Sequence, residues 1–321
     1  MTDTSSNAIW SAAQRPDTFE SRSHRFREEM RPVFYQWLGI SPESTVLDGG
    51  CGSGVFTCYL AQGLTSGHIT GFDINPGFIA YGTAKAQEMG LAGRMKLELA
   101  DGFALPYEDC AFDAVTNYTY VGVLSDPEAG LKELIRVCRP GGVVSCVVAS
   151  NSIPNIGWQG DYPFDGADEL QRLASLESMI FTGFAFRGAD WKQSRAWHAC
   201  RYPKLLETCG LGDIRVYPFA HLMCYGDAAY PLDYRRQLAV AETQEEINWL
   251  QSRYAGKESI YERHGFTRGD FERLLCLLQR KLAYLKEHFD TDQSYEWHGG
   301  FNIIVTGTKR GRGSGNGLAA C

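Results

Sequence analysis

Apolar residues follow two different periods along this chain. Between residues 45 and 149, short runs rich in aliphatic residues alternate with longer segments in which apolar residues recur every three or four positions. The first pattern is typical of buried strands and the second of amphipathic helices. We expect strands at 45–48, 68–73, 95–99, 111–117 and 142–149, and helices at 54–63, 76–89 and 127–138. This alternation predicts βαβ units and a parallel sheet.

The alternation stops after Ser150. Residues 151–195 hold prolines, glycines and many aromatic residues, which predicts an irregular, partly helical insertion. We expect the core to continue with a helix at 196–209, a sixth strand at 214–220 and a last strand at 301–308. A second, helical insertion separates these last two strands.

Two capping-box-like pairs lie in this second insertion, Thr243 with Glu246 and Thr267 with Asp270, and each predicts the start of a helix. An apolar stripe follows the second pair and consists of Phe271, Leu274, Leu278, Leu282, Leu285 and Phe289. The stripe must pack on something. The core of the insertion is the simplest partner, and a homodimer contact through residues 221–299 is the alternative.

The first forty residues also have a helical period, and Pro32 should kink or restart the helix. The apolar positions of this segment are Phe19, Phe26, Met30, Phe34 and Trp37. The expected organisation is an N-terminal helical cover (1–40), a core (41–150), an insertion over the active site (151–195), the core continued (196–220), a helical insertion (221–299), the last core strand (300–308) and a flexible tail (309–321).

Charge and composition narrow the function classes. The 31 Lys and Arg against 38 Asp and Glu give a net charge of −7, and the basic residues are scattered, which disfavours a nucleic-acid partner and favours a small molecule. No apolar run is long enough to span a bilayer, so we expect a cytoplasmic protein without a membrane partner. None of the ten cysteines forms a C-x-x-C pair, so neither a disulfide framework nor a metal site is expected.

A glycine-rich turn carries the most informative chemistry. Strand residues 45–48 end in Asp48, and Gly49, Gly50, Gly52 and Gly54 follow. Glycines let the backbone pass close to a bound ligand. A carboxylate in front of them repels a pyrophosphate and suits a ligand with an ammonium and a sulfonium group. An NAD-dependent oxidoreductase is the alternative, although Val55 stands where the dinucleotide fingerprint has Gly or Ala.

The D-x-G-x-G-x-G run resembles motif I of class I S-adenosylmethionine-dependent methyltransferases, and the following segments resemble that superfamily in order. Asp73 comes 25 residues after Asp48, and the resemblance makes it the acceptor for both ribose hydroxyls. By the same resemblance Asp101 accepts from the adenine amino group and Phe103 is a wall of the base pocket. The cofactor-binding residues implied are Asp48, Gly49, Gly50, Gly52, Gly54, Asp73, Ile74, Asp101, Gly102, Phe103 and Asn117.

The turn from Arg136 to Gly142 resembles the small-molecule branch of the superfamily, which includes the ubiquinone and menaquinone methylases. The resemblance implies an α/β, Rossmann-like sheet of seven mostly parallel strands, the last antiparallel, with helices on both faces and helical cover insertions. It also implies S-adenosyl-L-methionine as cofactor and methyl transfer to O, N, C or S of a small metabolite. The alternative from another class is a non-catalytic S-adenosylmethionine-binding regulatory module.

The fourth strand departs from part of the superfamily. Amino-methylases of nucleic acids carry an N-P-P-Y type motif at its end, where this chain has Asn117, Tyr118, Thr119 and Tyr120. Asn117 is placed to contact the methionine part of the cofactor. The sequence identifies no catalytic residue. Tyr118 and Tyr120 at this strand end, His221 after the sixth strand and His24 on the N-terminal helix are weak candidates, and packing or surface roles are at least as frequent for such residues.

Overall fold

The computed structural model describes residues 23, 25–149, 162–185, 199–291 and 296–311. The chain divides into two compact units. The core unit comprises 1–150, 195–219 and 301–321, and the helical unit comprises 151–194 and 220–300. His24 lies outside the described residues, as do the stretches 151–161 and 186–195 of the first predicted insertion and residues 196–198 of the helix predicted after it.

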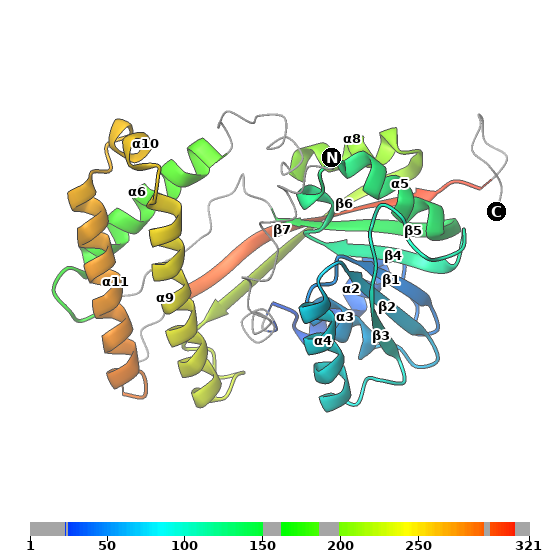
Figure 1. Ribbon diagram of the computed structural model, residues 1–321. Helices are drawn as coiled ribbons and strands as arrows, with labels where there is room; N and C mark the ends of the chain where they lie inside the picture. The colour runs from blue at the N-terminus through cyan, green and yellow to red at the C-terminus, as the bar shows by residue number, and fades with distance from the viewer. Residues whose placement is uncertain (1–22, 24, 150–161, 186–198, 292–295, 312–321) are drawn as a thin grey trace. The chain divides into compact units, whose positions relative to one another are not determined.

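The sheet has seven strands in the order β3-β2-β1-β4-β5-β7-β6 (Figure 1). Their bounds are Thr45–Gly49 (β1), His68–Asp73 (β2), Met95–Leu99 (β3), Phe112–Tyr118 (β4), Cys138–Ala149 (β5), Leu211–Cys224 (β6) and Trp297–Lys309 (β7). Strands β1 to β5 pair in parallel, and β7 pairs with β5 in the antiparallel sense. The predicted α/β fold class, with its antiparallel last strand, is confirmed.

Helices cover both faces of the sheet because neighbouring strand residues point to opposite sides. Val46 of β1 belongs to one apolar cluster and Leu47 to another. The first cluster includes side chains of α2, α3 and α4, and the second includes side chains of α5 and α8. The bounds are Arg31–Leu38 (α2), Val55–Ala61 (α3), Pro76–Glu88 (α4), Pro127–Val137 (α5) and Tyr202–Thr208 (α8), with 3₁₀ turns Glu28–Met30 (η1), Val121–Val123 (η2) and Ala199–Arg201 (η4).

The helical unit is built from α6 (Ala167–Ala185), α9 (Leu232–Tyr254), α10 (Glu258–Arg263) and α11 (Arg268–His288). The predicted stripe on α11 packs inside this unit, where Leu274, Leu278 and Leu282 join a cluster with residues of α6 and α9. The stripe is therefore core of the insertion. A homodimer through residues 221–299 stays a prediction, without this stripe as its basis.

Three local expectations can be compared with the structure. Thr267 and Asp270 form the predicted capping box of α11. Pro32 lies in the first turn of α2, so the predicted helix restart is also confirmed. The expected helix start at Thr243 is wrong: this residue lies within α9, and its hydroxyl donates to the carbonyl of Ala239 at 2.8 Å. A threonine that bonds back one turn satisfies its hydroxyl without capping.

Strand β5 begins four residues earlier than expected. Cys138 pairs with Phe112 before the register shifts and Val143 pairs with Ala114. The breaker residues between them form a bulge, in which Gly141 has a φ of 77°. Among the described residues, no helix is long and apolar enough to cross a membrane.

Candidate functional site

The three spaced glycines between β1 and α3 all have left-handed backbone, with φ of 61°, 55° and 83° at Gly50, Gly52 and Gly54. Their surroundings differ. A methyl group added at Gly54 would lie 3.0 Å from Leu97, and one added at Gly50 would overlap the ring of Tyr120. A methyl group at Gly52 would meet nothing within 4 Å. Gly52 is thus the glycine beside which a ligand has room.

Asp48, at the end of β1, is buried and only half satisfied. Its Oδ2 accepts a hydrogen bond from the Thr57 hydroxyl at 2.6 Å, while its Oδ1 has no partner among the described residues. Burial raises the pKa of this carboxyl to about 7, against the Thr57 bond, and the charge of Asp73 raises it further. Thr116, its register partner on β4, also has a buried oxygen without a partner. Such orphaned oxygens suit a ligand that brings donors or positive charge.

Asp73, at the end of β2, is held by backbone amides. Its Oδ2 accepts from the N–H of Gly52 at 2.9 Å and its Oδ1 from the N–H of Asn75 at 2.9 Å. Burial raises the pKa of this carboxyl, and these backbone bonds oppose the rise. A carboxylate has about four acceptor positions, so these two bonds leave acceptor capacity for a ribose.

The ends of β2 and β3 expose apolar side chains next to these acids. Ile74, Leu99 and Phe103 are 56%, 59% and 41% exposed. Asp101 follows β3, and its Oδ1 accepts from the N–H of Phe103 at 3.0 Å, which fixes the start of the loop. Apolar surface with a few polar groups is what a planar base requires. No group of three or more His, Cys, Asp or Glu in the described part of the chain is arranged to hold a metal ion.

Comparison with known proteins agrees with this arrangement. Residues 46–142 match the family model described as a methyltransferase domain. The chain is similar to the methyltransferase GfsG of Streptomyces halstedii, at 26% identity over 57% of this chain and 58% of that protein. It is also similar to the demethylmenaquinone methyltransferase of Bacillus cytotoxicus, at 29% identity over 57% of this chain and 76% of that protein.

The core unit belongs to the class I S-adenosylmethionine-dependent methyltransferase superfamily. S-adenosyl-L-methionine is accordingly its cofactor. The chain spans little more than half the length of GfsG. Among solved structures, the [4+2]-cyclase SpnF is similar to this chain with a TM-score of 0.48 and 18% identity, over 88% of this chain and 81% of that one.

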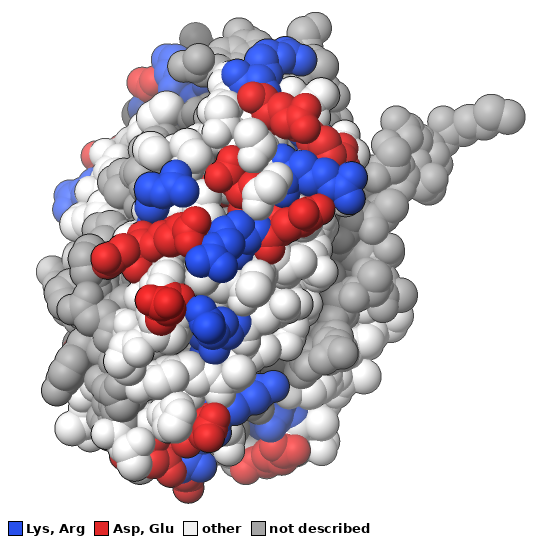
Figure 2. Space-filling model, turned by 90° about the vertical axis from the view of Figure 1, so that its left-hand side faces the viewer, with Lys and Arg blue, Asp and Glu red and all other residues white. Residues whose placement is uncertain are grey.

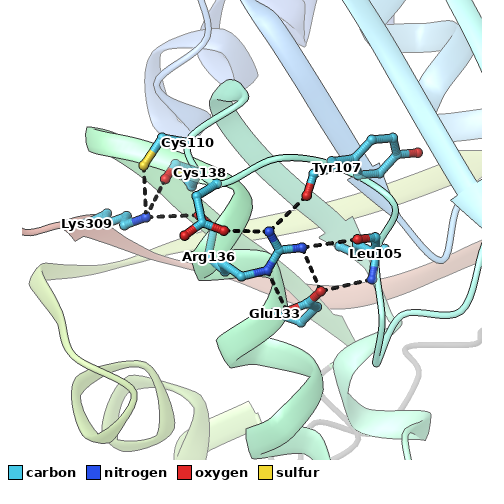
Figure 3. A network of polar contacts seen from close by, with 8 residues as sticks. Leu105, Tyr107, Cys110, Glu133, Arg136, Cys138 and Lys309 are labelled. Carbon is cyan, nitrogen blue, oxygen red and sulfur yellow. Dashed lines mark hydrogen bonds and ion pairs between the residues drawn. The ribbon is translucent and has the colours of Figure 1, made fainter. Parts of the chain in front are cut away.

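An arginine holds the loop that joins β3 to β4 in the methyltransferase domain (Figure 3). Arg136, near the end of α5, donates to the carbonyl oxygens of Leu105 and Tyr107 at 3.1 and 2.8 Å. It also pairs with Glu133, which accepts from the N–H of Leu105 at 2.9 Å. Lys309 of β7 donates to the carbonyl of Arg136 at 3.0 Å. The loop that carries Asp101 to Phe103 is therefore fastened to the body of the domain.

The structure separates the polar residues predicted at the end of β4. The side-chain nitrogen of Asn117 donates to the carbonyl of Ser145 at 2.9 Å, so it is directed into the sheet. The Tyr118 hydroxyl accepts from Asn302 at 3.0 Å. The Tyr118 ring packs edge-on against Phe26 in an aromatic cluster. The Asn117 side-chain nitrogen and the Tyr118 hydroxyl oxygen are thus both engaged within the core unit.

Tyr120 lies against the glycine turn that follows β1. Its ring packs edge-on against Phe72, with centroids 5.7 Å apart, and against Gly50 and Gly102. Burial, with the charges of Asp73 and Asp101, raises the pKa of its hydroxyl, so the phenol stays protonated and is a poor base. The side chains of the candidates His221 and His24 are outside the described residues, and their roles stay predictions.

Sequence reasoning missed two polar neighbours of Asp48. Thr57 lies in the first turn of α3, so a hydroxyl nine residues after the acid was a local signal that could have been used. Thr116 had no such signal, because only the pairing of β1 with β4 brings it beside Asp48.

Proposed function

We propose that this protein transfers the methyl group of S-adenosyl-L-methionine to an O, N, C or S atom of a small metabolite. The observation that carries the proposal is the buried Asp48 carboxylate beside the glycine turn, one oxygen of which has no partner in the described part of the chain. A cationic amino-acid nucleoside offsets that buried charge, whereas the pyrophosphate of NAD would add to it. This contrast favours methyl transfer over hydride transfer.

The residues present fit the parts of this cofactor. Asp48 lies where it attracts the positive charge of the methionine part, and the room beside Gly52 lets the cofactor approach the backbone. Asp73 has acceptor positions left for the ribose, and Asp101 and Phe103 border the base. The cofactor supplies an already activated methyl group. The protein's task is then to hold the acceptor atom in line with it and to exclude water.

Surface charge supports a small acceptor. Figure 2 shows Lys and Arg interspersed with Asp and Glu on the described part of one face, without a gathering of one sign. The net charge of the chain is −7. A phosphate backbone would require a concentrated basic surface. The relatives include a demethylmenaquinone methyltransferase, whose name states a small-molecule acceptor.

Calorimetry with S-adenosylhomocysteine tests the cofactor site. We expect binding by the wild-type protein and at least roughly tenfold weaker binding by Asp73→Ala, because the ribose loses its acceptor. Asp168→Ala, an exposed acid on α6, is the matched control and should bind like the wild type. Failure of the folded wild type to bind would overturn the proposal, and a rise in melting temperature with NAD would favour the oxidoreductase.

Turnover needs a separate assay. Transfer of a labelled methyl group from S-adenosylmethionine is measured over a panel of hydroxyl, amine, thiol and activated-carbon metabolites. We expect at least one class of acceptor to be methylated. Tight cofactor binding without transfer to any acceptor would support the non-catalytic binding module instead.

A further inference from the structure

The ring of Tyr120 lies where three strand ends meet. It covers Gly50 after β1, contacts Phe72 near the end of β2 and brings its hydroxyl against Gly102 after β3. A methyl group added to either of these two glycines would overlap the tyrosine. The side chain therefore fills the space that the two missing Cβ atoms leave open.

The same space is the one that the nucleoside requires. Phe72 immediately precedes Asp73, and Gly102 immediately follows Asp101. A ligand whose ribose bonds to the first acid and whose base bonds to the second must run between them. We propose that the Tyr120 side chain competes with the adenosine of the cofactor for this space and swings aside when the cofactor binds. This inference rests on the proposed function.

Tyr120 is held by packing alone, so that it is free to move. Among the described residues its hydroxyl has no hydrogen-bond partner, whereas the Tyr118 hydroxyl accepts from Asn302. Movement of Tyr120 therefore sacrifices no hydrogen bond. The ring remains protonated and uncharged, so its displacement moves no charge out of the site.

The backbone next to Tyr120 is strained. Thr119 is exposed and has a φ of 55°, a region that β-branched residues avoid. Backbone strain of this kind concentrates at ligand clamps and switch segments. The next residues form the turn η2, whose Val121 is fully buried. Tyr120 thus lies between a strained position and an anchored one, where rotation of its side chain leaves the rest of the turn in place.

Binding kinetics of substituted proteins test the competition. S-adenosylhomocysteine is titrated by calorimetry and mixed in stopped flow with the wild type, Tyr120→Ala and the matched control Tyr120→Phe. We expect Tyr120→Ala to associate faster and to bind at least threefold tighter. In the wild type, the fraction of molecules whose adenosine space is filled by the tyrosine ring lowers the apparent affinity, and the alanine variant lacks this fraction. Tyr120→Phe keeps the ring and should behave like the wild type. Circular dichroism confirms that each variant is folded.

The outcomes separate this inference from the proposed function. Weaker or unchanged binding by folded Tyr120→Ala, with normal wild-type binding, overturns the competition alone and makes the ring a wall of the pocket. No binding by any of the three folded proteins overturns both proposals. In a crystal structure with S-adenosylhomocysteine, the ring should lie away from Gly50 and Gly102, and a ring still seated on them beside the bound nucleoside would contradict the inference.

Discussion

The buried carboxylate of Asp48 lowers the stability of the folded state and is explained by its place in the proposed binding site. Its carboxylate is 1% exposed, and its Oδ1 lacks a partner among the described residues. Desolvation then favours the neutral form, which is why its pKa rises from an ordinary 3.8 to about 7. An asparagine would satisfy packing without this cost, so the acid is best explained by the ligand that it attracts.

Asp48→Asn is expected to stabilise the folded protein at alkaline pH. Because the folded pKa exceeds the unfolded one, the native state binds more protons between pH 4 and 7, and wild-type stability falls as pH rises through this window. A rise from 3.8 to about 7 corresponds to at most about 4 kcal/mol at pH 8. Urea unfolding at pH 5 and pH 8 measures the difference.

The same variant should bind S-adenosylhomocysteine more weakly, because the charge that offsets the ammonium is removed. Thr57→Val is a useful companion variant, since it removes the only hydrogen bond to the carboxylate that the structure describes and should raise its pKa further. A wild-type stability that increases between pH 5 and 8 by an amount that Asp48→Asn abolishes would contradict the assignment.

At the scale of elements, close packing of α4 on the glycine turn shapes the site. A Cβ at Gly82 of α4 would lie 2.5 Å from both Leu97 Cδ1 and the carbonyl oxygen of Ser53. Ser53 lies between Gly52 and Gly54, so the helix contacts the turn directly. The register of α4 is thereby coupled to the backbone that faces the cofactor.

Gly82→Ala should push α4 away from the turn. We expect a loss of about 1–3 kcal/mol in unfolding free energy, because the overlapping oxygen belongs to backbone and cannot rotate away. Cofactor affinity should fall in parallel. Gly93→Ala is the control, since a Cβ there meets nothing within 4 Å. Chemical denaturation and calorimetry of the two variants should differ, and equal stability would show that the turn adapts to the helix.

A second element, α11, carries a buried charge into the helical unit. The Nζ of Lys281 is fully buried and lies 2.5 Å from Oε1 of Glu296, which precedes β7. The hydroxyl of Tyr162 donates to the same carboxylate. The attraction between two buried charges offsets the free-energy cost of removing them from water only when both are present. The contact therefore adds little net stability, and its main effect is to specify how α11 packs against this segment.

Lys281→Met is therefore expected to lower the unfolding free energy by about 3–5 kcal/mol, because the Glu296 carboxylate stays buried without its cation. Adding Glu296→Gln should recover part of the loss. Lys132→Met, which breaks an exposed pair with Glu128, should change stability little. Thermal unfolding of these variants gives the comparison, and equal effects of the two single lysine variants would contradict the interpretation.

On the scale of the whole molecule, the chain crosses between its two units four times, after residues 150, 194, 219 and 300. The residues assigned to the cofactor all belong to the core unit, and the predicted covering role of the helical unit stays a prediction. Ligand protection should reveal how far the effect of the cofactor extends.

Hydrogen exchange with and without S-adenosylhomocysteine measures this extent. At a ligand concentration of about 100 Kd, global stabilisation is about 2.7 kcal/mol. We expect the largest added protection at the turns after β1 and β2, where Gly52 N–H bonds to Asp73. The Asp73→Ala variant should lose it. Protection restricted to α9 and α11 would place the ligand outside the core unit.

The sequence by itself determined where the strands lie to within a few residues, and it determined the cofactor class, whereas the residues it assigns to the cofactor stay predictions. Short apolar runs located β2 and β3 to the residue, because breaker residues bound both strands. The acid before the glycine turn could also be identified from the sequence. A ligand that lies close to the backbone requires glycines there, and these glycines directly follow the acid in the chain. The stripe on α11 was identified in the same way.

The tertiary structure decided what depends on residues distant in the chain. Thr116 reaches Asp48 only through strand pairing, and Thr243 continues a helix because α9 packs along α11, despite its cap-like spacing. Tyr120 covers the glycine turn because β1, β3 and β4 end at the same edge of the sheet. Local patterns record backbone conformation and burial, but the neighbours that fill a site come from separate strands and are known only once the sheet is assembled.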